Sequence, residues 1–338
     1  MPQSLLGPHG YFPEKQPNIE TIRLITDGAC PAHVHHKLQL ALGEFPRLKK
    51  LSWKGLCSTQ DFEALADVLR KRFKQLEELE VDLTYYNLIQ EIIGGRFFVT
   101  SDDDGDDTDE DDDYDFVFVA KIIKLERGIM PFTNLTSLDL SGVSFAPGDK
   151  QDVKQRMLDG IVHSFDFGSL FLLRLRRCPG WGLLLELLAS SSRPMRLKVL
   201  EIQSSPLTIH SDDNMSAKEN QTIGAFIQTF QGLRELIIST CGPDDSTGLW
   251  NAMLNHRATL ARFVQHQRTA ALSQLRLLDV NGLSVINPRD SNDRPLGTEN
   301  PLGELDLIAV GLCCEPQTMV CYLHRQHTEY LLLLLTSQ

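Results

Sequence analysis

One short pattern recurs along the chain and restricts its fold more than any other feature. The pattern spans six residues, of which the first, fourth and sixth are apolar, and it occurs nine times among 338 residues. The copies begin at Ile19, Leu48, Leu76, Leu135, Leu170, Leu197, Leu233, Leu275 and Leu302. Their start-to-start distances of 29, 28, 59, 35, 27, 36, 42 and 27 residues indicate a period of about 30 residues with insertions.

Each triplet predicts a short strand, because alternate side chains of a strand point to the same side and the second and third apolar residues can share a core. Five of the nine copies also carry a phenylalanine three residues before the first apolar residue. Apolar residues between the copies recur at helical spacing in three stretches. They are Phe62, Leu65, Val68 and Leu69, then Val153, Met157, Leu158 and Ile161, then Ile223, Phe226, Ile227 and Phe230. We therefore expect an α/β fold in which strands and helices alternate in a parallel arrangement.

At these residues the chain resembles the leucine-rich repeat family, over roughly residues 19–311. Cys178 and Cys241 fall on the ninth repeat position, which holds Asn or Cys in that family. Cysteine at this position, together with long helical repeats, is similar to the cysteine-containing intracellular type, and the irregular insertions look like those of fungal F-box/LRR proteins. The resemblance implies a solenoid, a right-handed α/β horseshoe with parallel strands on the concave face and helices on the convex face. The other seven copies depart from the family at the ninth position.

The repeat divides the chain into segments. We expect an N-terminal lead-in at 1–18, the leucine-rich repeat solenoid at 19–311 and a C-terminal capping segment at 312–338. A disordered acidic insertion is expected at about 98–115, inside the longest gap between copies. No F-box is recognisable ahead of the first repeat, so a link to a ubiquitin ligase adaptor rests on the resemblance alone.

The charge of the chain is uneven. The net charge is −12, but residues 101–115 hold 11 acidic and no basic residues, and the remainder has 34 acidic against 33 basic residues. Nucleic acid binding is therefore not expected, since it needs clustered lysine and arginine. The seven cysteines are irregularly spaced and no long apolar run occurs. These features favour a cytoplasmic or nuclear protein with no membrane contact.

The acidic segment itself has three possible uses. An EF-hand calcium loop is excluded, because with Gly105 as the sixth residue the first ligand would be Thr100. The segment could be a solvated, self-repelling loop with at most loose cation binding, a histone contact or nucleic acid mimic as in acidic nuclear LRR proteins, or a mask over basic strands of the same chain. The sequence leaves these three open.

The third, fifth and seventh positions of each copy should face away from the core. They predict basic strands in the second and fifth copies, an acidic strand in the third, and apolar side chains on the later copies. A protein partner is expected to use the basic residues for charge complementarity and the apolar ones for affinity. The expected partner-binding residues are Lys50, Lys54, Leu172, Arg174, Arg176, Val199, Ile237 and Leu277.

Catalytic and metal motifs are not recognisable. Neither the histidines at 33, 35 and 36 nor the Cys and His residues between 313 and 327 have the paired spacing of structural zinc sites, so no metal or other cofactor is expected. No P-loop, GxSxG, HExxH or GxGxxG motif occurs, which favours a non-enzymatic binding module. Substrate recognition for an SCF-type ubiquitin ligase is the first hypothesis, and an acidic nuclear LRR regulator of the histone-binding or GTPase-activating kind is the alternative.

Overall fold

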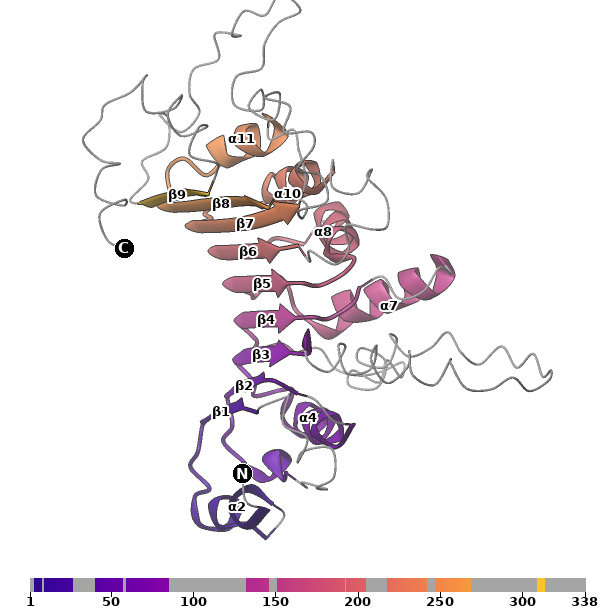
Figure 1. Cartoon of the computed structure of the whole chain (residues 1–338), viewed down its shortest axis with the longest axis vertical. Helices are drawn as coiled ribbons and strands as arrows, with labels where there is room; N and C mark the ends of the chain where they lie inside the picture. The colour runs from indigo at the N-terminus through magenta and orange to yellow at the C-terminus, as the bar shows by residue number, and fades with distance from the viewer. Residues whose placement is uncertain are drawn as a thin grey trace, which may run out of the picture.

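The fold is built on one parallel β-sheet whose strands follow the order of the chain. The computed structural model describes residues 3–7, 9–26, 40–56, 59–84, 132–145, 151–191, 193–204, 218–241, 247–268 and 309–313. Within them nine strands pair in the order β1 to β9, and every pair is parallel. The strands therefore stack one above another along the long axis of the molecule (Figure 1).

The first seven strands lie where the triplets predict them. They are β1 (Thr21–Ile25), β2 (Lys50–Lys54), β3 (Glu78–Asp82), β4 (Ser137–Ser141), β5 (Leu172–Arg176), β6 (Val199–Gln203) and β7 (Glu235–Cys241). Each begins two residues after the first apolar residue of its triplet. The second and third apolar residues of neighbouring triplets also pair in register, as Leu173 with Leu200 and Leu175 with Ile202 show.

The last two strands correct the prediction. β8 (Arg262–Arg268) pairs with β7, and β9 (Ala309–Cys313) pairs with β8, so the triplets that begin at Leu275 and Leu302 do not occupy these positions. Both of those triplets lie outside the described residues. The strand β8 escapes a search for apolar triplets because the amide of Gln265 stands at the third apolar position, after Leu260 and Phe263.

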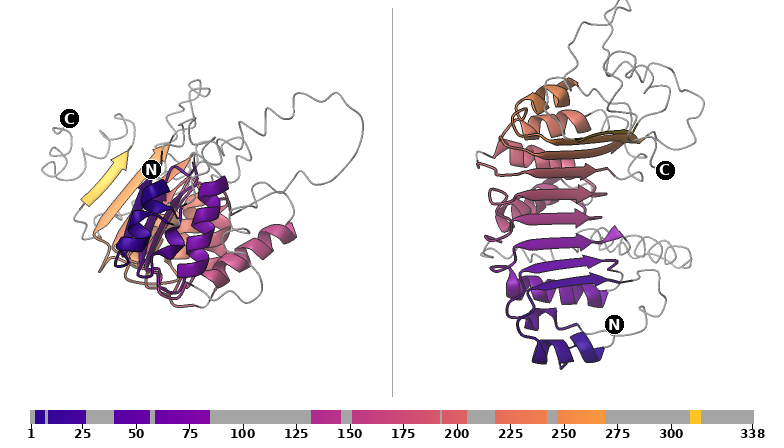
Figure 2. Two further views of the ribbon diagram at one scale, coloured as in Figure 1. Left: turned by 90° about the horizontal axis from the view of Figure 1, so that it is seen from below. Right: turned by 90° about the vertical axis from the view of Figure 1, so that its left-hand side faces the viewer.

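Two short helices precede β1, and helices between later strands cover one face of the sheet (Figure 2). The bounds are α1 (Gln3–Leu6), α2 (Tyr11–Lys15), η1 (Leu42–Glu44), α4 (Thr59–Arg72), α7 (Gln151–Ser164), α8 (Trp181–Ser190), α10 (Glu219–Ile227) and α11 (Thr247–Leu254). The three predicted helical stretches correspond to α4, α7 and α10. In the part of the chain that the structure describes, no helix is long and apolar enough to cross a membrane.

The core lies between the sheet and these helices. The second and third apolar residues of the first seven triplets are buried, and so are Leu260 and Phe263 of the eighth repeat. Burying one such side chain contributes about 1.5–3 kcal/mol. At the entry to the strands, Phe132 stacks on Phe165 with ring centroids 5.0 Å apart, and Phe73 and Phe167 extend this row edge to face. Aromatic packing thus connects successive repeats.

Candidate partner-binding face

The face of the sheet opposite the helices, here called the open face, carries the third, fifth and seventh residues of the first seven triplets. In β2, Leu51 and Trp53 are buried, whereas Lys50, Ser52 and Lys54 remain at least partly accessible. The same alternation holds along β1, β3 and β5. The structure therefore places Lys50, Lys54, Leu172, Arg174, Arg176, Val199 and Ile237 on the open face, as the sequence predicts, whereas Leu277 lies outside the described residues.

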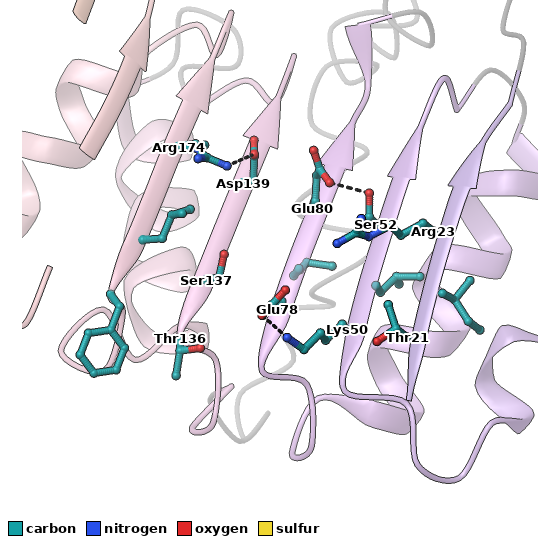
Figure 3. A pocket seen from close by; sticks show the side chains of 15 residues that line it. Thr21, Arg23, Lys50, Ser52, Glu78, Glu80, Thr136, Ser137, Asp139 and Arg174 are labelled. Carbon is teal, nitrogen blue, oxygen red and sulfur yellow. Dashed lines mark hydrogen bonds and ion pairs between the residues drawn. The ribbon is translucent and has the colours of Figure 1, made fainter. Parts of the chain in front are cut away.

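A shallow hollow of about 350 Å³ crosses the open face from β1 to β5 (Figure 3). Thr21 and Arg23 of β1 lie at one end, and Phe171 and Leu172 lie at the other. Between them stand hydroxyl groups, including that of Ser137, and ion pairs that join neighbouring strands. The hollow is open and mostly polar, which suits an extended segment of a macromolecule better than an enclosed small molecule.

The lysines of β2 are paired with the glutamates of β3. Lys50 Nζ lies 2.5 Å from Glu78 Oε1, and Lys54 Nζ lies 2.8 Å from Glu80 Oε1. The Ser52 hydroxyl also donates to Glu80, at 2.5 Å. The hydrogen bond to Glu78 raises the pKa of Lys50. Burial favours a higher pKa for Glu80, but hydrogen bonds from Lys54 and Ser52 outweigh it and lower the pKa. Both strands therefore hold their charges as pairs.

The arginines of β5 are held between two buried carboxylates. Arg176 makes a two-point contact with Glu201 of β6, through Nε to Oε1 at 2.7 Å and through the terminal nitrogen to Oε2 at 3.0 Å. It also donates to Asp139 of β4 at 3.1 and 3.2 Å. Arg174 forms ion pairs with the same two carboxylates, at 3.0 and 3.5 Å. We call these four residues the ion cluster.

The ion cluster has no net charge and is partly removed from water. The side chains of Asp139 and Glu201 are 6% exposed, and those of Arg174 and Arg176 are 33% and 27% exposed. Burial raises the pKa of Asp139 although Arg176 acts in the opposite direction, and the hydrogen bonds to Glu201 raise the pKa of Arg176. The basic strands that the sequence predicts are thus neutralised by their neighbours in the sheet.

Apolar side chains form a strip on the open face of the later strands. Leu172 of β5 pairs in register with Val199 of β6, and Ile237 of β7 pairs with Val264 of β8. The two pairs lie in neighbouring rows of the sheet, because Val199 pairs with Glu235 and Ile237 pairs with Glu201. Phe171, which precedes β5, is 45% exposed. We call Phe171, Leu172, Val199, Ile237 and Val264 the apolar strip. The sequence alone did not single out Phe171, which lies one residue before the alternating positions, or Val264, which belongs to the missed strand.

Cys178, at the ninth position of its repeat, is a core residue. Its thiol is 1% exposed and donates to the carbonyl groups of Leu140 and Arg176, each at 3.3 Å. Burial raises the pKa of this thiol to about 12. A thiol with such a pKa is protonated and unreactive at neutral pH, so Cys178 contributes to packing rather than to chemistry.

Other candidate groups from the sequence fall outside the structure. The acidic insertion at 98–115, the histidines at 33–36 and the side chains of the Cys and His residues between 313 and 327 lie beyond the described residues. Among the residues that the structure does describe, no three His, Cys, Asp or Glu side chains are placed to hold a metal ion.

Comparison with known proteins adds no relative from which a function could be transferred. No family model, curated protein or solved structure matches the chain. The open face itself is therefore the basis for a proposed function.

Proposed function

We propose that the chain is a leucine-rich repeat solenoid, a right-handed α/β horseshoe with the open face on its concave side. In this proposal the open face binds a protein partner and catalyses no reaction. The observation that carries the proposal is the apolar strip, where large side chains stay accessible beside the hollow. Accessible apolar residues on adjacent strands are typical of binding surfaces.

The apolar strip supplies the affinity in this proposal. Leu172 and Val199 lie side by side, and Phe171 extends the surface toward the hollow. A partner side chain that covers these residues would remove apolar area from water, at about 25 cal/mol per Å². The ion cluster lies next to Leu172 on the same strands and presents a surface whose charges are already satisfied. Binding there would not require breaking the cluster.

The charged residues take a different role from the one that the sequence suggests. Lys50, Lys54, Arg174 and Arg176 each have a carboxylate partner within 3.5 Å. An acidic partner would have to compete with these carboxylates, so it would gain little from the four residues. They contribute shape and orientation instead. The lysines are held in pairs between β2 and β3, and the arginines in a network that joins three strands, which limits the motion of their side chains.

The biological setting of the partner is proposed from the resemblance to F-box/LRR proteins. It suggests that the partner is a protein to be ubiquitinated by an SCF-type ligase in the cytoplasm or the nucleus. The second candidate, an acidic nuclear LRR regulator, is favoured by the 11 acidic residues between 101 and 115. Binding of purified histones or of small GTPases, abolished by deletion of residues 101–115, would support this second candidate.

The first test uses a double substitution in the apolar strip. Phe171→Glu/Leu172→Glu places two charges on the strip, and Tyr11→Glu is the matched control, because Tyr11 is 54% exposed but lies on α2. Affinity purification from cells with quantitative mass spectrometry compares both variants with the wild type. We expect specific partners to be lost at least tenfold from the double variant and kept by the control. Equal recovery by both variants, with unchanged circular dichroism, would refute the proposal.

A further inference from the structure

Among the strands that the structure describes, β1 has one edge without a neighbour. β1 stands at the end of the strand order and pairs with β2 alone. Lys50 N–H donates to Glu20 C=O at 3.0 Å, and Thr26 N–H donates to Lys54 C=O at 2.9 Å. Backbone groups alternate in direction along a strand, so the even-numbered residues of β1 bond β2. The amide and carbonyl groups of Thr21, Arg23 and Ile25 therefore point away from the sheet.

These outward groups find no partner within the described residues. None of the three residues makes a hydrogen bond through its outward backbone groups or its side chain there. All three side chains are exposed, and Ile25 is 85% exposed, whereas Lys50 and Ser52 on the neighbouring strand are half-buried. An exposed edge strand with unpaired backbone groups is a template for another strand.

Arg23 gives this edge a charge preference. Its guanidinium group forms no ion pair with any residue that the structure describes, although Lys50 on the adjacent strand is bonded to Glu78. Arg23 and Lys50 repel each other, which adds to the preference for an anion near Arg23. A carboxylate opposite Arg23 would form a cross-strand pair of the kind that stabilises sheets.

We propose that the outer edge of β1 binds an extended acidic peptide segment of a partner protein as an additional strand. The segment bonds the backbone groups of Thr21, Arg23 and Ile25, and places an acidic side chain beside Arg23. Two residues from that acid, an apolar side chain packs on Ile25, because side chains on one face of a strand recur at every second residue. This binding mode goes beyond the proposed function, which concerns the apolar strip on β5–β8.

A second copy of the chain fits the same edge poorly. Two β1 strands related by a two-fold axis would pair antiparallel, and in the register with the greatest overlap Arg23 would lie directly opposite the Arg23 of the other copy. Like charges directly opposite each other destabilise a strand pair. The charge of Arg23 therefore selects an acidic partner over self-association.

The test uses a synthetic peptide and the full chain. The probe is a fluorescent nine-residue peptide with glutamate at its centre, valine two residues to either side and threonine elsewhere, so that it fits in both strand directions. Fluorescence polarisation measures its binding to the wild type, Arg23→Glu and Ile25→Pro. Proline at position 25 removes an outward N–H and leaves the bonds between β1 and β2 intact. A second peptide carries lysine in place of glutamate.

We expect the glutamate peptide to bind the wild type, and Ile25→Pro to weaken its binding at least tenfold. Arg23→Glu should weaken it by a similar factor and should bind the lysine peptide instead. The Phe171→Glu/Leu172→Glu variant should bind the glutamate peptide normally, which separates this site from the apolar strip. No binding to the wild type, equal binding to Ile25→Pro, or dimerisation through β1 that Arg23→Glu does not alter would overturn the proposal.

Discussion

The arginines of the ion cluster have ion-pair partners, whereas the arginine at the edge of β1 has none among the described residues. In the middle of the sheet, Arg174 and Arg176 have carboxylates on both neighbouring strands, so each guanidinium group has ion-pair partners within the fold. At the end of the sheet, Arg23 has a neighbouring strand on one side only, and that strand, β2, carries Lys50. The position of β1 and β5 in the sheet thus decides whether their arginine side chains stabilise the fold through ion pairs or remain available for a partner.

This difference changes which residues of the open face are expected to bind. A charge that is paired inside the sheet stabilises the fold, and a partner gains little from it. An unpaired charge at an edge contributes little to stability and can be used in binding. Stability measurements on single variants can therefore test whether the two regions differ in this way.

The largest effect is expected in the ion cluster. Glu201→Gln removes one buried charge and leaves Arg174 and Arg176 with Asp139 alone. We expect the free energy of unfolding to fall by about 3 kcal/mol, at the lower end for a buried pair because both guanidinium groups are partly exposed. Urea denaturation measures it. A loss below about 1 kcal/mol would mean that the cluster behaves as ordinary surface ion pairs.

A somewhat smaller effect is expected beside β1. Gly55 has φ of +76°, and a Cβ atom there would collide with the carbonyl oxygen of Thr26, which follows β1. Gly55→Ala should destabilise the protein by about 2 kcal/mol, because it combines left-handed strain with this collision. Arg177 stands at the equivalent position after β5 and adopts φ of 52° with a side chain, so Arg177→Ala is the matched control and should cost less. Equal losses in thermal denaturation would contradict this reading.

Acid should weaken the far end of the sheet before it affects β1. His256 is buried, its Nδ1 accepts from Leu233 N–H at 3.2 Å, and its Nε2 lies 2.8 Å from the carbonyl oxygen of Ile227. Burial lowers its pKa, the bond to Ile227 opposes this, and the charge of Lys198 lowers it further. The neutral ring therefore stabilises the fold above the unfolded pKa of about 6.5, and this stability is lost as the pH falls.

Hydrogen exchange at pH 7.5 and 5.5 measures this effect. We expect the protection factor of the Leu233 amide, which corrects for the slower intrinsic exchange in acid, to be smaller at the lower pH in the wild type. The control, His256→Leu, should lose about 1–2 kcal/mol at pH 7.5, because Leu233 N–H and Ile227 C=O lose their partner, but should show less change between the two pH values. Identical pH dependence in the wild type and the variant would exclude His256 as the source.

The smallest effect is expected at the edge. Arg23→Ala removes an exposed side chain without an ion pair among the described residues, so the free energy of unfolding should change by less than about 0.5 kcal/mol. Denaturation in urea, run beside Glu201→Gln, gives the comparison directly. A loss close to that of Glu201→Gln would show that Arg23 has a structural partner and would remove the basis for treating the edge as free.

Much of the fold could be predicted from the sequence because burial follows a simple rule along a strand. Leu173 and Leu175 alternate with Arg174 and Arg176, so the pattern alone indicates which side chains enter the core. The same rule failed at Gln265, where a half-buried amide stands at a core position of β8. A search for apolar residues cannot recognise a strand near the end of the sheet that departs from the pattern in this way.

The pairing of charges could not be predicted in the same way. The sequence places Arg176 and Glu201 on the open face, but it does not show that one guanidinium group reaches two carboxylates on different strands. That contact depends on the register of β4, β5 and β6 and on side-chain rotamers. Arg23, in contrast, is the fifth residue of the first triplet, so the alternation along the strand alone predicts that its side chain points away from the core.

Photocrosslinking from the open face shows whether the apolar strip binds a protein partner in cells. A photoreactive phenylalanine analogue replaces Phe171 in one variant and Tyr11, on α2, in the other. After irradiation in cells, we expect discrete protein adducts from position 171 that disappear when Val199→Glu is added, and none from position 11. Adducts at both positions alike, or none at position 171, would contradict the account.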